Sequence, residues 1–451
     1  MKTLKLIATL GLCIILLATA VIACNDLATS SSVSPSPSAS ASPGPANGSF
    51  ELARSDVKRE SSPDVAQSDL SALVAGNNAF AVDMYKALNG EDGNLFFSPY
   101  SISVALAMTY AGARSETETQ MADTLHFMLP QEILHPAFNL LDTELAEQSE
   151  NMGPDEGDQF TLNIANSIWG QKDYAFLPAF LDTLAKNYGA GLRLVDFATA
   201  PEPARTAIND WVSTQTNQKI KDLIPQGAIT NLTRLVLANA IYFKASWLHQ
   251  FDEDLTRDEA FHMLDGSEVM VPMMSLSGPE HLGYVKGDGY QAVEIPYVGG
   301  KAAMTMILPD EGNFADFEAG LSAELIDEIV AGMEHKSVDL RLPKFSYEQA
   351  ISLRSILTQM GMQDAFDPGV ADFSGMDGTK HLYITDVFHK AFVAVDENGT
   401  EAAAATAVVV GVVSMPEAPV ELTVDRPFIF LIRDTENGQI LFTGRVINPA
   451  V

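Results

Sequence analysis

The sequence is poor in basic residues for its length. Its 451 residues include 27 Lys and Arg against 59 Asp and Glu, which gives a formal net charge of −32. Between Arg114 and Lys172 there is no Lys or Arg. An acidic surface repels phosphate backbones and anionic lipids. We therefore predict no nucleic-acid binding, and no polyanion-binding patch in that stretch.

Cysteine is almost absent as well. One of the two cysteines, Cys13, lies inside an apolar stretch at residues 6–23, and the other, Cys24, follows it directly. The rest of the chain therefore has no disulfide framework. Its fold must be held by a hydrophobic core, for which 47% hydrophobic residues are sufficient.

The N-terminus has the pattern of a targeting segment. Lys2 and Lys5 precede the apolar stretch, which predicts a secretory signal over residues 1–23. Its end, Val-Ile-Ala-Cys, resembles the lipobox of bacterial lipoproteins, in which the cysteine is lipidated; this implies Cys24 as the lipidation site. A signal peptide cut elsewhere and an uncleaved anchor remain alternatives.

Residues 24–66 include a Ser/Pro/Ala-rich run and are predicted to be a flexible tether. Tether and lipid together would display the protein outside the cell, with the lipid as its only link to a membrane.

Sequence motifs for catalysis are also missing. No Gly-rich phosphate loop follows a predicted strand, no Cys/His cluster has metal-ligand spacing, and no G-x-S-x-G elbow occurs. We predict no cofactor, no metal and no catalytic residue. A triad assembled from distant residues stays open, although Asp386 and His389 would point to opposite faces of a predicted strand.

What is present is a regular pattern of helices early and strands late. Helical periodicity runs from residue 70 to 88, Ser98-Pro99 is typical of a helix start, and residues 204–224 form a third amphipathic stretch. Predicted strands lie at residues 235–243, 302–308 and 338–342, and a hairpin at 427–446 has Asn437-Gly438 at its turn. This order favours an α+β protein with one large domain, residues 67–451.

Residues 396–413 read DENGTEAAAATAVVVGVV, which is unlike an ordinary loop. From Gly399 to Val413 there is no proline, and Glu401 is the only charged residue. A segment with these features can enter a β-sheet, because proline would remove a ladder hydrogen bond and a buried charge would be costly.

Four segments point to a known family. They are NLFFSPYSIS at 94–103, LANAIYFKASW at 237–247, HKA at 389–391 followed by DENGTEA at 396–402, and DRPFIF at 425–430. In this order and spacing they resemble the serpins, the serine protease inhibitors. The resemblance implies the serpin fold: a helical N-terminal part packed on a large central mixed β-sheet, further sheets, and an exposed reactive loop at about 397–426.

The resemblance also implies roles for particular residues. The hinge that precedes the loop comprises Glu397, Gly399, Thr400, Glu401, Ala402, Ala403, Ala404 and Ala405. The shutter, where the central sheet opens, comprises Ser98, Ser101, Asn239 and His389. The breach at the top of the opening has Trp247, with Lys344 as a partner for Glu397. Alternation in an inserted strand would face Thr400, Ala402 and Ala404 inward and Glu401 toward water.

The position of the reactive bond depends on the end of the loop from which it is counted. The family's usual spacing from Glu397 gives Val413-Ser414, whereas counting back from the C-terminal signature gives Met415-Pro416, and Ser414-Met415 is a further option. An aliphatic Val413 suits elastase-like or subtilisin-like serine proteases rather than trypsin-like ones.

We therefore expect a monomeric suicide-substrate inhibitor of extracellular serine proteases and not an enzyme. A non-inhibitory serpin that acts as a binding protein, and a secreted hydrolase, are the alternatives.

Overall fold

The structure, a computed structural model, describes residues 50–90, 93–150, 160–277, 281–400 and 418–451. They belong to one compact unit, Pro45–Val451. The helices are α1 (Gln67–Leu88), α2 (Pro99–Tyr110), α3 (Ser115–Leu125), α4 (Gln131–Glu150), α5 (Pro178–Tyr188), α6 (Pro201–Gln215), α7 (Phe314–Gly320), α8 (Ala323–Ala331), α9 (Arg354–Met360) and α10 (Ser374–Asp377).

Strands from both halves of the chain form a seven-stranded sheet, in the order β1-β4-β3-β5-β14-β13-β12. Its members are β1 (Glu51–Ala53), β3 (Phe160–Gln171), β4 (Leu192–Val195), β5 (Leu235–Ser246), β12 (Phe345–Ser352), β13 (Ile384–Val395) and β14 (Gly399–Thr400). The pairs β3–β4 and β5–β13 are parallel and the other pairs are antiparallel. The sheet is therefore mixed, as predicted.

The remaining strands form a second, ten-stranded sheet, in the order β2-β17-β16-β10-β9-β8-β11-β7-β6, with β15 paired to β11. Its members are β2 (Leu95–Phe97), β6 (Arg257–His262), β7 (Glu268–Leu276), β8 (His281–Lys286), β9 (Tyr290–Pro296), β10 (Ala302–Pro309), β11 (Glu334–Pro343), β15 (Val420–Thr423), β16 (Phe428–Asp434) and β17 (Ile440–Val446). Helices and two sheets in this arrangement confirm the α+β class.

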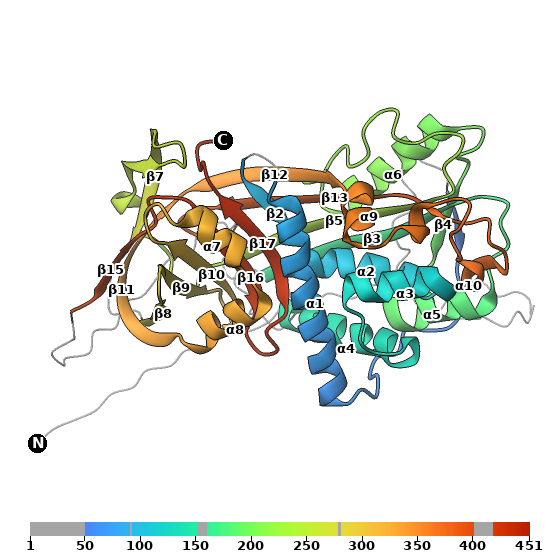
Figure 1. The fold of residues 1–451 in the computed structure, drawn as a ribbon, viewed down its shortest axis with the longest axis horizontal. Helices are drawn as coiled ribbons and strands as arrows, with labels where there is room; N and C mark the ends of the chain where they lie inside the picture. The colour runs from blue at the N-terminus through green and yellow to red at the C-terminus, as the bar shows by residue number, and fades with distance from the viewer. Residues whose placement is uncertain (1–49, 91–92, 151–159, 278–280, 401–417) are drawn as a thin grey trace, which may run out of the picture. The chain divides into compact units, whose positions relative to one another are not determined.

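Helices cover both faces of the seven-stranded sheet. Figure 1 shows α6 on one side of the strands and α2 to α5 on the other. Strand β5 is buried on both faces: Leu235, Leu237 and Ile241 belong to the main core, whereas Val236 and Ala238 belong to the cluster packed against α6. This confirms the prediction from its unbroken apolar run.

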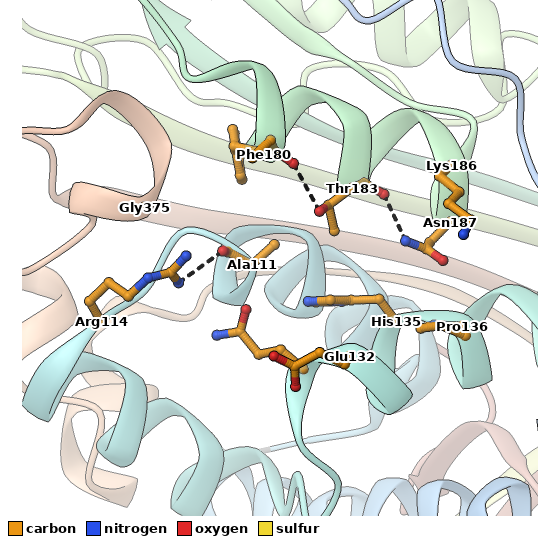
Figure 2. A pocket seen from close by; sticks show the side chains of 12 residues that line it. Ala111, Arg114, Glu132, His135, Pro136, Phe180, Thr183, Lys186, Asn187 and Gly375 are labelled. Carbon is orange, nitrogen blue, oxygen red and sulfur yellow. Dashed lines mark hydrogen bonds between the residues drawn. The ribbon is translucent and has the colours of Figure 1, made fainter.

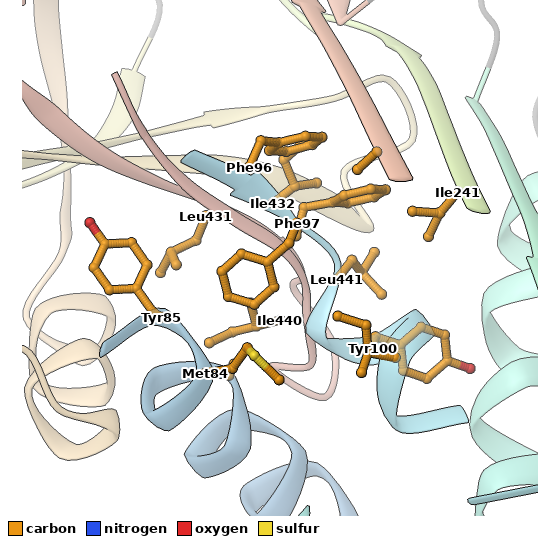
Figure 3. Close-up of a cluster of buried hydrophobic side chains, with 14 of the residues drawn as sticks. Met84, Tyr85, Phe96, Phe97, Tyr100, Ile241, Leu431, Ile432, Ile440 and Leu441 are labelled. Atoms are coloured by element: carbon orange, nitrogen blue, oxygen red, sulfur yellow. The ribbon is translucent and has the colours of Figure 1, made fainter. Parts of the chain in front are cut away.

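The main core joins the two sheets through β2 and α1. Figure 3 shows Phe96 and Phe97 of β2 beside Met84 of α1 and Ile440 of β17. The Phe96 ring is stacked on Phe442, with centroids 5.2 Å apart. These contacts fix the N-terminal end of α2, which directly follows β2, against the interior.

Local signals placed α1, α2 and the long strands correctly, but the third helix was predicted too long. α6 ends at Gln215 rather than at residue 224. Side chains replace the helical ladder here, because Thr216 Oγ1 accepts from the Ile220 amide and Asn209 Oδ1 accepts from the Ile224 amide. Hydroxyl and amide side chains compete with helix in this way.

The predicted boundary at residue 67 also differs from the structure. The three residues of β1 pair antiparallel with β4, and Arg59 forms an ion pair of 2.5 Å with Asp142 of α4. The Glu60 amide donates to the Lys186 carbonyl. The segment from residue 50 to 66, predicted as tether, therefore includes a strand and contacts of the domain.

Candidate functional site

The hinge begins in a tight turn at the end of β13. The Asp396 carboxylate accepts hydrogen bonds from the backbone amides of Asn398, at 2.9 Å, and Gly399, at 3.2 Å. This turn reverses the chain, so that β14 lies between β5 and β13 and pairs antiparallel with both. Gly399 and Thr400, the first two residues after the turn, thus already form a strand of the sheet.

Only glycine fits at the first position of β14. A Cβ atom on Gly399 would lie 2.1 Å from the carbonyl oxygen of Ala245 and 2.8 Å from Cα of Ser246. Any side chain here would push β14 away from β5. Gly399 therefore allows the close approach that brings the hinge into the sheet.

Thr400 faces inward at the top of the sheet and is 1% exposed. Its hydroxyl lies 2.7 Å from the hydroxyl of Tyr297. The Tyr297 ring is stacked on Trp247 at 4.6 Å, with an angle of 9° between the planes. The inward direction agrees with the alternation expected from the sequence.

Trp247 holds the turn from the opposite side. Its indole Nε1 donates to the Asp396 carbonyl, and its backbone amide donates to the Asn398 carbonyl, both at 2.9 Å. Because the indole is itself buried against Tyr297, the turn is fixed to the core as well as to the sheet.

Glu397 is a buried carboxylate with two partners. Lys344 Nζ donates to its Oε2 at 2.6 Å, and Thr256 Oγ1 donates to its Oε1 at 2.7 Å. Burial acts to raise the pKa of Glu397, but the hydrogen bonds from Lys344 and Thr256 outweigh it and lower the pKa below its ordinary value. Glu397 is therefore ionised and paired at neutral pH.

The four residues assigned to the shutter meet below the hinge. Ser98 caps α2, with its Oγ accepting from the Ser101 amide and donating to the Leu441 carbonyl at 2.6 Å. The Ser98 amide donates to Nε2 of His389 at 3.2 Å. All four side chains are fully buried.

These contacts fix the direction of each hydrogen bond. Since Nε2 of His389 accepts a hydrogen bond from the Ser98 amide, Nδ1 must carry the ring proton and donate to Asn239 Oδ1. Asn239 Nδ2 then donates to Ser101 Oγ at 2.6 Å. Burial lowers the pKa of His389 to about 3, so the imidazole is neutral.

A fifth residue of this network, Asn166 of β3, was missed from the sequence. Its Oδ1 accepts from Asn239 and from Ser101, and its Nδ2 donates to the Ser101 carbonyl. Asn166, Asn239 and His389 lie in register across β3, β5 and β13. The available signal was a polar residue within a strand-forming run, but Asn163 and Ser167 share that signal, and the partners of each depend on sheet register.

Several predicted positions lie outside the described residues. They are Cys24, Glu401, Ala402 to Ala405, and the reactive-bond candidates Val413 to Pro416.

Within the described residues, Asp386 and His389 do not meet, and no cluster suited to a metal ion is found. His389 contacts Asn239 and the Ser98 backbone, whereas Asp386 accepts from Ser352, so the two do not form a dyad. Within residues 50–451, gaps excepted, no three His, Cys, Asp or Glu side chains gather in a way suited to a metal ion. None of the described helices is both long and apolar enough to cross a membrane.

Comparison with known proteins gives one consistent result. Residues 75–449 match the family model described as Serpin (serine protease inhibitor). An uncharacterized serpin-like protein of Thermococcus kodakarensis is 42% identical over 84% of this chain and 86% of its own length. The leukocyte elastase inhibitor of Homo sapiens is 38% identical over 84% of this chain and 100% of its own.

A solved structure agrees with this comparison. The thermophilic serpin tengpin in its native state matches with a TM-score of 0.76 and 28% identity, over 88% of this chain and 100% of that one.

Proposed function

Because the chain belongs to the serpin family, we propose that it inhibits extracellular serine proteases as a suicide substrate. The target's serine attacks the carbonyl of a residue in the loop after the hinge, and forms an acyl-enzyme. The cut loop then inserts between β5 and β13 before the ester is hydrolysed. The protein supplies the bait and the conformational change, and the protease supplies the catalytic groups.

The observation that carries this proposal is the position of β14. Gly399 and Thr400 already separate the upper ends of β5 and β13. Below them the two strands pair directly, from Ile384 with Leu235 to Phe392 with Tyr242. Continued insertion therefore needs no new site, because the inserted strand only extends the one that has begun.

Insertion also has a source of free energy. It replaces one parallel ladder by two antiparallel ladders, which are slightly more stable per residue. With about 0.5–1.5 kcal/mol net per hydrogen bond, the gain over the paired length is on the order of 10 kcal/mol. This is comparable to the stability of a whole domain, so the uncut protein would be held by a kinetic barrier.

The sequence of the loop supports an elastase-like or subtilisin-like target. Residues 399–413 contain no Lys or Arg, which a trypsin-like pocket requires. The relative from Homo sapiens is named as an inhibitor of leukocyte elastase. We propose Val413-Ser414 as the reactive bond, with Ser414-Met415 and Met415-Pro416 as alternatives.

The proposal is tested by mixing the protein with pancreatic elastase and, separately, with trypsin. We expect a one-to-one adduct that resists SDS with elastase and much less with trypsin. Mass spectrometry of the released C-terminal peptide identifies the bond. Cleavage without any adduct would instead support a non-inhibitory serpin, and turnover of a substrate by the protein itself would support a hydrolase.

We further propose that Cys24 carries a lipid and that the following Ser/Pro-rich residues display the inhibitor outside the cell. The support is the Val-Ile-Ala-Cys sequence at the end of the apolar stretch. Expression in a bacterial host should place the protein in the membrane fraction. The Cys24→Ser variant should leave that fraction, and equal fractionation of both would contradict the proposal.

A further inference from the structure

Strand β14 has a single side chain with which to hold the hinge in the sheet. It consists of Gly399 and Thr400, and glycine has no side chain. The Thr400 hydroxyl lies 2.7 Å from the hydroxyl of Tyr297, and neither group has another hydrogen-bond partner among the described residues. Both residues are buried, with exposed fractions of 1% and 0%. An unpaired hydroxyl would be costly at this place, so each group holds the other.

Tyr297 is fixed by contacts that do not involve the hinge. It lies between β9 and β10 of the ten-stranded sheet, and its backbone bridges to Trp247, which follows β5. Its ring is stacked on Trp247 and meets Phe243 edge-on, with centroids 5.2 Å apart. The Tyr297 amide donates to the Ala302 carbonyl at 3.0 Å. These contacts hold the hydroxyl at the point where Thr400 enters the sheet.

The fold tolerates buried polar groups without partners elsewhere. A cavity of about 270 Å³ lies between α4, α5 and the C-terminal end of α2, and Figure 2 shows His135 and Asn187 among the side chains around it. His135 Nε2 and Asn187 Oδ1 are enclosed and have no partner among the described residues. The loss of one buried hydrogen bond is therefore compatible with folding. The bond between Tyr297 and Thr400 stands where the proposed insertion starts, which points to a role beyond stability.

We propose that Tyr297 is a positioning residue that holds the hinge in the sheet through the hydroxyl of Thr400. The pair keeps β14 between β5 and β13, so that insertion after the cut continues from a strand that is already in place. Without this bond β14 would leave the sheet more often, and insertion would have to begin by separating the two strands. The consequence for inhibition rests on the proposed function, whereas the position of the hinge in the uncut protein does not.

The test measures amide hydrogen exchange in the uncut, full-length protein. Two segments report on the hinge: residues 396–400, and residues 244–248, where the Trp247 amide donates to the Asn398 carbonyl. Tyr297→Phe removes only a hydroxyl group, and Thr400→Val replaces a hydroxyl by a methyl group of similar size. Since each change leaves one buried hydroxyl unpaired, we expect about 5- to 30-fold faster exchange in both segments. Exchange in β16 and β17 should not change, which separates a local effect from a general loss of stability.

The double variant gives the decisive comparison. Tyr297→Phe combined with Thr400→Val places two apolar groups together, a change that can be nearly neutral, so exchange at the hinge should return toward that of the unaltered protein. The control is Tyr284→Phe, which removes a buried hydroxyl that donates to Gln291 in the ten-stranded sheet at 2.8 Å; both segments should stay unchanged. Single variants without effect, or a double variant that exchanges as fast as the faster single variant, would overturn the proposal.

Reaction with elastase connects the position of the hinge to inhibition. The yield of SDS-resistant adduct should fall in each single variant and return in the double variant. If exchange follows the expected pattern but the unaltered protein forms no adduct, the proposed function fails and the role of Tyr297 in holding the hinge stands. Equal adduct yields from the unaltered protein and all three variants would overturn its role in insertion.

Discussion

The hinge and the shutter hold the same two strands, β5 and β13, by different chemistry. At the hinge, β14 already lies between the strands, and the contacts include the ion pair of Glu397 with Lys344. At the shutter the strands pair directly, and the contacts are neutral hydrogen bonds among buried side chains. One end of the interface is thus open and charged, and the middle is closed and uncharged.

This difference separates two steps of the proposed insertion. At the hinge, β14 can lengthen as long as the residues that enter the sheet tolerate burial. At the shutter, the inserted strand must separate His389 from Asn239, whose groups are costly when left unpaired. The hinge sequence should therefore decide whether insertion starts, and the shutter should set the barrier that it meets.

The largest expected effect is at the hinge, from Thr400→Arg. Thr400 is buried against Tyr297, so its replacement would place a guanidinium there without a partner, at a cost of several kcal/mol. Insertion should slow while the bond is still cut. We expect the SDS-resistant adduct to fall at least about tenfold, with cleavage at the same bond and active protease remaining.

The matched control for this variant is Glu401→Arg. Alternation places residue 401 on the solvent face of an inserted strand, so this variant should keep most of its inhibition. If the two variants inhibited equally, the inward and outward assignment of the hinge would be wrong.

A smaller effect is expected at the shutter, from Asn239→Ala. The change leaves the Nδ1 proton of His389 and Oδ1 of Asn166 without this partner. We expect a loss of about 1–3 kcal/mol in the free energy of unfolding, measured by urea denaturation. Asn163→Ala, a half-buried position on the same strand as Asn166, serves as the control and should cost less. Equal losses of unfolding free energy in the two variants would mean that the shutter network stabilises the protein no more than a half-buried asparagine does.

The pH should also act on the shutter before it acts on the hinge. The pKa of His389 is lowered from 6.5 to about 3 in the folded protein. The unfolded chain therefore binds more protons between these values, and stability falls as pH drops from 6.5 toward 3, by at most about 1.4 kcal/mol per pH unit for this group. His135, with a pKa of about 4, adds to the slope in the same direction.

The measurement is the urea midpoint at pH 7 and pH 5. The His389→Gln variant should show a shallower dependence on pH than the unaltered protein. A slope that did not change would assign the acid sensitivity to other groups.

The smallest effect is expected from Lys344→Gln at the hinge. The lysine is partly exposed, and Glu397 keeps its bond from Thr256, so we expect a loss of up to about 1 kcal/mol at pH 7. Since the pKa of Glu397 is lowered, this contribution is present above about pH 4.5 and disappears as pH falls through the folded value. A loss at pH 7 as large as that of Asn239→Ala would remove the contrast between the two regions.

Some of this arrangement could be read from neighbouring residues. The cap of Ser98 on α2, the double-sided burial of β5 and the inward face of Thr400 all follow from periods and propensities that act over a few positions. Family resemblance added the four shutter residues. Neither local patterns nor the family resemblance identified Asn166, because no local pattern indicates which polar residue will lie beside Asn239.

The sequence alone determined the helix starts, the strand-forming runs and a loop segment free of proline, since these depend on contacts within a turn or on alternate residues. Only the tertiary structure decided the pairings. Asn239 meets His389 across 150 positions and Asn166 across 73; β1 joins the edge of the sheet; and His135 lines a cavity with Asn187. The reason is that sheet register and helix packing are set by the whole core at once, so no single segment contains the information.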